Sequence, residues 1–146
     1  MGFDVRAALE GFDQPRLQAL VETMFLAADA DGELTEDERV ELERSIQSVA
    51  SGTPHEASLS GEGLAALLTQ AQADLARDGR ELRLEVVRNR LGDATACAGA
   101  LGLAIRVTAA DGQLRTSERE FLFDLAMALH VDQDEAADLV RELTRL

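Results

Sequence analysis

The feature that most constrains the fold of this chain is a motif that occurs twice. Residues 30–42 read ADGELTEDERVEL and residues 110–122 read ADGQLRTSEREFL, so seven positions are identical at an offset of 80. In each copy the apolar spacing predicts one helix before the motif and another after it. Two similar helix–loop–helix halves in a short chain predict packing about a pseudo-two-fold axis. We place the halves at about residues 15–77 and 94–146.

The spacing of apolar residues predicts helices along almost the whole chain. Leu17, Leu20 and Met24 follow the spacing of one buried helix face. Residues 94–108 are apolar nearly all round, with Arg106 as the only charge, so this helix is expected at the centre of the domain. No stretch shows the sustained alternation of a strand. We therefore predict one all-α domain over residues 1–146, with about seven or eight helices in two pseudo-symmetric halves.

The charge of the chain excludes several classes of function. There are 28 acidic residues, 14 arginines and no lysine, which give a formal net charge of −14. Such a chain repels phosphate backbones and anionic membranes, so no nucleic-acid or membrane partner is expected. With no Trp, no Tyr and five Phe, it also lacks a platform on which bases could stack. The acid excess favours cations, or a partner protein with a basic surface.

Three further features bear on location and origin. No segment reaches the ~18 to 20 apolar residues that a membrane span needs, and the N-terminus lacks the pattern of a signal peptide, so we expect a cytoplasmic protein. A single cysteine, Cys97, excludes an internal disulfide framework and a cysteine-based zinc cage. The lysine-free, alanine- and arginine-rich composition is typical of GC-rich bacterial coding sequences.

Each copy of the motif carries a glutamate at an unexpected position. Glu38 and Glu118 fall on the apolar stripe of the helix that follows each loop, where an unpaired charge would be costly to bury. Thr35 and Glu38 have the spacing of a capping box, which explains Glu38 by local structure alone. The corresponding position of the second copy holds Arg115, so capping explains Glu118 less well. Two alternatives therefore stay open, namely helix caps without further function and a cation site.

The motif also has part of the spacing of an EF-hand calcium loop. Ala27 stands at the first ligand position of one copy, and Val107 and Ala109 stand at the first and third positions of the other, so neither loop alone is a good calcium site. A site shared by the two copies would instead use four carboxylates. Oxygen ligands of this kind suit a hard divalent cation, namely calcium, magnesium or manganese. The residues predicted to bind it are Asp31, Glu38, Asp111 and Glu118.

The repeated pattern of an apolar helix, an ADG-x-L-x-x-x-E loop and a second helix resembles the TerB-like family of tellurite-resistance domains. The residues that carry this resemblance are Ala28 to Leu34 with Glu38, and Ala109 to Leu114 with Glu118. The resemblance covers nearly the whole chain and implies an all-helical domain with two related halves. It also implies metal binding by the acids of the repeats and a place as a module in a bacterial stress, secretion or defence system.

The remaining residues give little support to an enzyme. Cys97 lies on an apolar helix and is expected to act as a small hydrophobic residue, and His55 and His130 are expected at the surface or at a helix end. The sequence contains no nucleophile–base pair, and a hydrolase that uses the paired carboxylates would lack orienting groups. We therefore expect a non-enzymatic cation-binding module. The alternative is a metal-free acidic adaptor that binds a basic protein partner.

Overall fold

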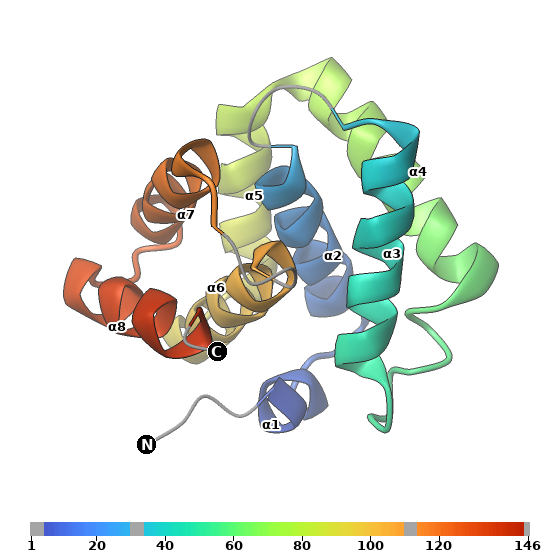
Figure 1. Cartoon of the computed structure of the whole chain (residues 1–146), viewed down its shortest axis with the longest axis horizontal. Helices are drawn as coiled ribbons and strands as arrows, with labels where there is room; N and C mark the ends of the chain where they lie inside the picture. The colour runs from blue at the N-terminus through green and yellow to red at the C-terminus, as the bar shows by residue number, and fades with distance from the viewer. Residues whose placement is uncertain (1–4, 30–33, 110–113, 145–146) are drawn as a thin grey trace.

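The computed structural model describes residues 5–29, 34–109 and 114–144, and in these ranges it contains eight α-helices and no strand (Figure 1). The all-α prediction is therefore confirmed. In chain order, the helices are α1 (Val5–Glu10), α2 (Gln14–Ala28), α3 (Glu36–Ala50), α4 (Gly61–Asp78), α5 (Arg80–Leu91), α6 (Ala94–Thr108), α7 (Thr116–Ala128) and α8 (Gln133–Leu143). No helix in the described ranges is long and apolar enough to cross a membrane.

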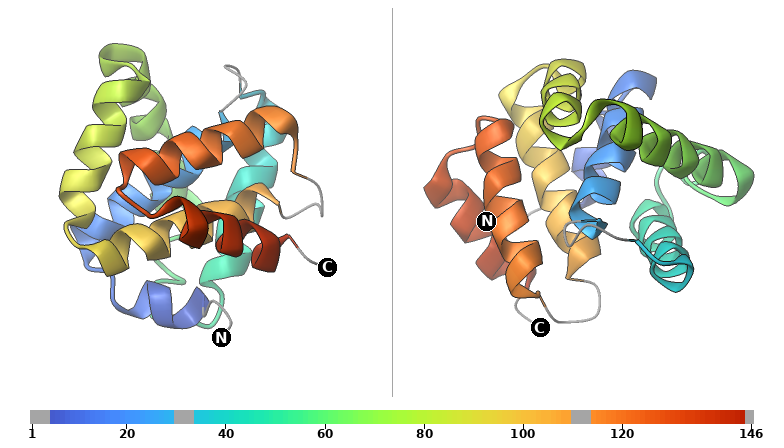
Figure 2. Two further views of the ribbon diagram at one scale, coloured as in Figure 1. Left: turned by 90° about the vertical axis from the view of Figure 1, so that its left-hand side faces the viewer. Right: turned by 90° about the horizontal axis from the view of Figure 1, so that it is seen from above.

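Helices α2 and α6 form the centre of the molecule. They lie side by side, with α7 and α8 beyond them on one side and α3 and α4 on the other (Figure 2). The central position expected for residues 94–108 is confirmed, because ten residues of α6 are buried. Each of the outer helices buries one apolar stripe against this central pair, as α8 does with Ala136, Val140 and Leu143.

Helix α2 is buried more completely than its sequence predicts. The apolar spacing indicates one buried face, but every residue from Ala19 to Ala27 is buried, including Glu22 and Thr23. The reason is that α2 contacts five other helices, α3, α4, α5, α6 and α7. Thr23 satisfies its hydroxyl within the helix, because Oγ1 donates to the carbonyl oxygen of Ala19 at 2.7 Å. Glu22 needs a partner from elsewhere in the chain.

The helix boundaries follow from local chemistry. Asp13 caps α2 by accepting a hydrogen bond from the backbone N–H of Arg16 at 3.1 Å, and Pro15 occupies the first turn, where the missing N–H costs nothing. Gly79 and Gly92 follow α4 and α5 with φ of 83° and 85°, which favour glycine. Asp132 caps α8 by accepting a hydrogen bond from the backbone N–H of Asp134 at 3.2 Å.

A buried ionic network joins α2, α4 and α5. Arg83 of α5 and Glu22 of α2 are each only 4% exposed and form a bidentate pair, with Nε–Oε2 at 2.6 Å and Nη2–Oε1 at 2.8 Å. Nη1 of Arg83 also donates to Oδ2 of Asp78 at 2.9 Å, and Asp74 lies 3.4 Å from Nη2. The guanidinium is thus surrounded by carboxylates from two other helices. These bonds offset the cost of removing the charges from water.

The carboxylate of Asp78 makes the stability of the fold depend on pH. Hydrogen bonds from Arg77 and then from Arg83 hold the pKa of Asp78 at about 2, below its ordinary 3.8. The unfolded chain therefore takes up this proton at a higher pH than the folded chain does. The contribution of Asp78 is complete above pH 3.8 and is lost as the pH falls toward 2.

We accordingly expect the midpoint of thermal unfolding to fall more steeply with acidification in the wild type than in Asp78→Asn. The window in which the two slopes differ runs from pH 3.8 down to about 2. Circular dichroism at a series of pH values measures both slopes. Parallel curves for the two proteins would contradict this role of Asp78.

Candidate functional site

The two glutamates of the repeated motif each lie near the start of a helix. Glu38 lies in the first turn of α3 and Glu118 in the first turn of α7, and both side chains are partly buried. The predicted ligands Asp31 and Asp111 lie outside the described residues. The structure therefore places two of the four predicted site residues.

Both glutamates cap the helix on which they lie. Oε1 of Glu38 accepts a hydrogen bond from the backbone N–H of Thr35 at 2.9 Å, and Oγ1 of Thr35 accepts one from the N–H of Glu38 at 3.2 Å. Oε1 of Glu118 accepts from the N–H of Arg115, also at 2.9 Å. An arginine side chain has no acceptor, so only this half of the capping box forms at α7. Capping is expected to explain Glu38 better than Glu118. This is correct for the bond that the N-cap side chain accepts, which forms only at Thr35. It is wrong for the bond that the glutamate accepts, which forms at both helices.

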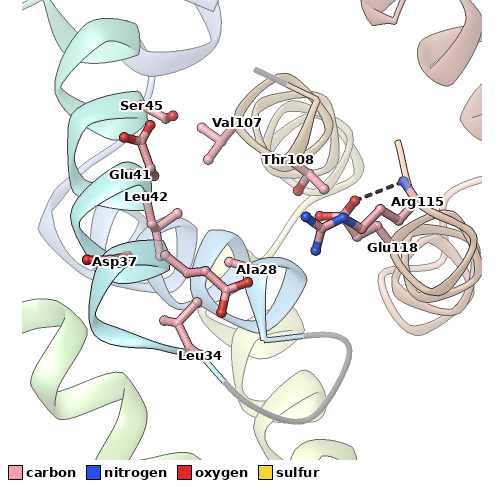
Figure 3. A pocket seen from close by; sticks show the side chains of 11 residues that line it. Ala28, Leu34, Asp37, Glu41, Leu42, Ser45, Val107, Thr108, Arg115 and Glu118 are labelled. Carbon is pink, nitrogen blue, oxygen red and sulfur yellow. Dashed lines mark hydrogen bonds between the residues drawn. The ribbon is translucent and has the colours of Figure 1, made fainter. Parts of the chain in front are cut away.

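Glu38 and Glu118 line the same cavity, although 80 residues separate them in the sequence. The cavity has a volume of about 280 Å³ and lies between α3 and α7 (Figure 3). Carboxylates stand on both sides of it, and apolar side chains come from the ends of α2 and α6. Its lining residues are Ala28, Leu34, Asp37, Glu38, Glu41, Leu42, Ser45, Val107, Thr108, Arg115 and Glu118.

The cavity carries an excess of negative charge. Four of its lining side chains are carboxylates and one is a guanidinium. Glu41 forms an ion pair with Arg44 on the exposed face of α3, so part of its charge is already balanced. Thr108 directs its hydroxyl back into its own helix, where Oγ1 donates to the carbonyl oxygen of Ala104 at 2.7 Å. The arrangement therefore attracts cations, and its apolar side chains can contact a hydrocarbon stem.

The described part of the cavity does not by itself complete a metal site. In residues 5–29, 34–109 and 114–144, no three His, Cys, Asp or Glu side chains are grouped closely enough to hold a metal ion. The chemistry of the donors present is nevertheless that of a hard cation, since they are carboxylate and hydroxyl oxygens. A complete site would need the aspartates of the two loops.

Arg80, which no sequence pattern singles out, joins the two sides of this region. Its Nη2 donates to the carbonyl oxygen of Asp29, the residue that ends α2, at 3.1 Å. Its guanidinium lies over the ring of Phe121 on α7, with 4.8 Å between Cζ and the ring centroid. Arg80 thereby connects the start of the first loop to the helix that follows the second. A long-range contact of this kind has no signal in the spacing of the chain.

The histidines and the cysteine lie away from the cavity. His130 is exposed and follows α7 with φ of 59°, the left-handed conformation that ends many helices. His55 lies in the turn region between α3 and α4, and its Nε2 is buried without a hydrogen-bond partner among the described residues. Cys97 is buried in α6, and burial raises the pKa of its thiol. Cys97 thus has the environment of a structural cysteine rather than of a nucleophile.

Comparison of the chain with models of protein families, with curated proteins and with solved structures gives no match.

Proposed function

We propose that this chain is a TerB-like module that binds a divalent cation between its two repeated loops. The observation that carries the proposal is that Glu38 and Glu118, one from each copy of the motif, line a single cavity. Their capping bonds engage Oε1 in both cases, so Oε2 is the atom that we assign to the cation. Asp31 and Asp111 would supply the remaining carboxylates. The protein contributes binding rather than catalysis in this proposal.

Three features support a pseudo-two-fold relation between the halves. Helix α2 contacts α4, α5 and α7, and α6 correspondingly contacts α8, α1 and α3. The relation would pair the four helices α1–α4 with the four helices α5–α8, which extends the halves predicted from the sequence. Asp13 and Asp93, 80 residues apart, both accept an N-terminal capping bond. The capping bonds of Glu38 and Glu118 have the same length of 2.9 Å.

A cation held in this way would tie the starts of α3 and α7 together. The carboxylates repel one another without a cation, and its charge would remove that repulsion. Binding to the folded state alone would stabilise the domain, by about 1.4 kcal/mol at a free concentration ten times the Kd. By the family resemblance, we propose that this module acts in a bacterial stress response of the tellurite-resistance type.

Protein purified without chelator should contain a divalent metal, and calcium, magnesium or manganese should raise its unfolding midpoint above that in EDTA. Replacing both loop aspartates, Asp31→Asn with Asp111→Asn, should abolish the metal content and the rise. Elemental analysis and thermal melts measure the two effects. Asp124→Asn with Asp134→Asn is the matched control, because it removes two carboxylates at exposed positions outside the cavity.

The alternative is a metal-free adaptor for a basic protein, and α3 favours it. Glu36, Asp37 and Glu41 are exposed on this helix, and Val40 is 46% exposed among them. Binding of an arginine-rich peptide in EDTA, lost in Asp37→Asn with Glu41→Gln, would support the adaptor. Unchanged metal content and melting in the double loop variant would refute the shared cation site.

A further inference from the structure

Arg115 differs from its counterpart in the first copy of the motif. Both residues are N-caps with extended backbone conformation, φ −74° and ψ 166° at Thr35 and φ −69° and ψ 158° at Arg115. Thr35 accepts a hydrogen bond from the N–H of Glu38, and an arginine cannot form the equivalent bond. The start of α7 therefore lacks a stabilising side-chain cap that the start of α3 has. Helix capping does not explain why an arginine is present here.

The position of the side chain offers an explanation. Arg115 lines the cavity beside Glu118, and its side chain extends from α7 toward the α3 side (Figure 3). Asp37, Glu38 and Glu41 lie on that opposite side. Among the described residues Arg115 is exposed and forms no ion pair. With respect to the described carboxylates, its charge therefore acts on the cavity as a whole and is not committed to one of them.

We propose that Arg115 is the resident counter-cation of this cavity and sets its affinity for added cations. With Arg115 in place the lining side chains carry a net charge of −3, and without it they would carry −4. A divalent cation that enters is repelled by the guanidinium, so the charge of Arg115 weakens its binding. The identity of the ligand rests on the proposed function, but the effect of the Arg115 charge on the cavity can be tested without a bound cation.

The first test compares Arg115→Thr with the wild type in calorimetric titrations with CaCl₂ and with MnCl₂. Arg115→Thr restores the hydroxyl cap of the first copy, so the helix start is retained. We expect binding to tighten by a factor of about five, the effect of removing one unit charge about 8 Å from a divalent cation in water. Arg115→Lys should bind as the wild type does. Arg119→Thr, four residues further on and exposed, makes the same charge change outside the cavity lining and should leave the affinity unchanged.

The second test needs no cation ligand. Without Arg115 no positive charge in the lining offsets the repulsion among the four carboxylates, and salt screens this repulsion. Charges are screened much more strongly in about 500 mM NaCl than in about 20 mM NaCl. The unfolding midpoint of Arg115→Thr in EDTA should therefore rise more between these two concentrations than the midpoint of Arg119→Thr does. Equal salt responses of Arg115→Thr and Arg119→Thr would overturn the proposed role of Arg115. Equal cation affinities of Arg115→Thr and the wild type, if the wild type binds a cation, would overturn it as well. A larger salt response with no metal binding in any variant would support it while refuting the cation-binding function.

Discussion

Replacing Arg83 by methionine is expected to lower the free energy of unfolding by about 3–5 kcal/mol. The substitution leaves the carboxylate of Glu22, which is 4% exposed, without its bidentate partner at 2.6 and 2.8 Å. Asp74 and Asp78 lose the same guanidinium. Glu22 keeps only the distant guanidinium of Arg90, whose Nη1 lies 4.0 Å from Oε1, and a poorly paired buried charge costs far more than the pair gains over an apolar replacement. Urea unfolding followed by circular dichroism measures the change.

Two further variants separate the broken pair from the loss of an arginine as such. Arg88→Met makes the same replacement on α5 at a residue that has no ion pair among the described residues, and it should cost much less. Glu22→Leu combined with Arg83→Met removes both partners of the bidentate pair, while Asp74 keeps its ion pair with Arg77 at 3.2 Å, so most of the loss should be recovered. A single Arg83→Met variant as stable as Arg88→Met would show that the network contributes little.

The second large effect is expected at the centre of the fold, where Leu101→Ala should cost about 2–5 kcal/mol. Leu101 is 0% exposed on α6, the helix that packs against α2. Truncation removes buried apolar surface and leaves a cavity that the surrounding helices can fill only in part. Denaturant unfolding measures the loss, with the slope of the transition as a check that the unfolded state is unchanged.

Leu82→Ala is the matched control, because the same atoms are removed from a side chain that is 47% exposed on α5. It should change the free energy of unfolding by roughly 0.5 kcal/mol or less. Similar losses for the two leucines would mean that the contact between α2 and α6 is not the core of the molecule.

The helices of this fold could be predicted because their signals are local. Apolar spacing, the caps at Asp13 and Asp93 and the glycines at 79 and 92 all act within a few residues of the boundary they set. The absence of charge along residues 94–108, apart from Arg106, likewise indicated a central helix. The prediction of a repeat rests on identities at one offset, and the glutamate of each copy accepts a capping bond of 2.9 Å.

The features that could not be predicted depend on which distant surfaces meet. Glu22 stands within an apolar run and so could have been marked as a buried charge, but nothing local identifies Arg83, 61 residues away, as its partner. The sequence also could not show that Glu38 and Glu118 line one cavity, because this follows from how α3 and α7 pack around α2 and α6. The effect of Arg115 on that cavity depends on the same packing.

The burial of α2 from Ala19 to Ala27 has a consequence for how the chain folds. The helices that cover α2 include α5, α6 and α7, which are all synthesised after it. A nascent chain that ends after α4 therefore exposes the apolar residues between Ala19 and Ala27 that the later helices cover. The two copies of the motif cannot mature one after the other as independent units. They are expected to reach the native state together, in one cooperative transition after α7 has been synthesised.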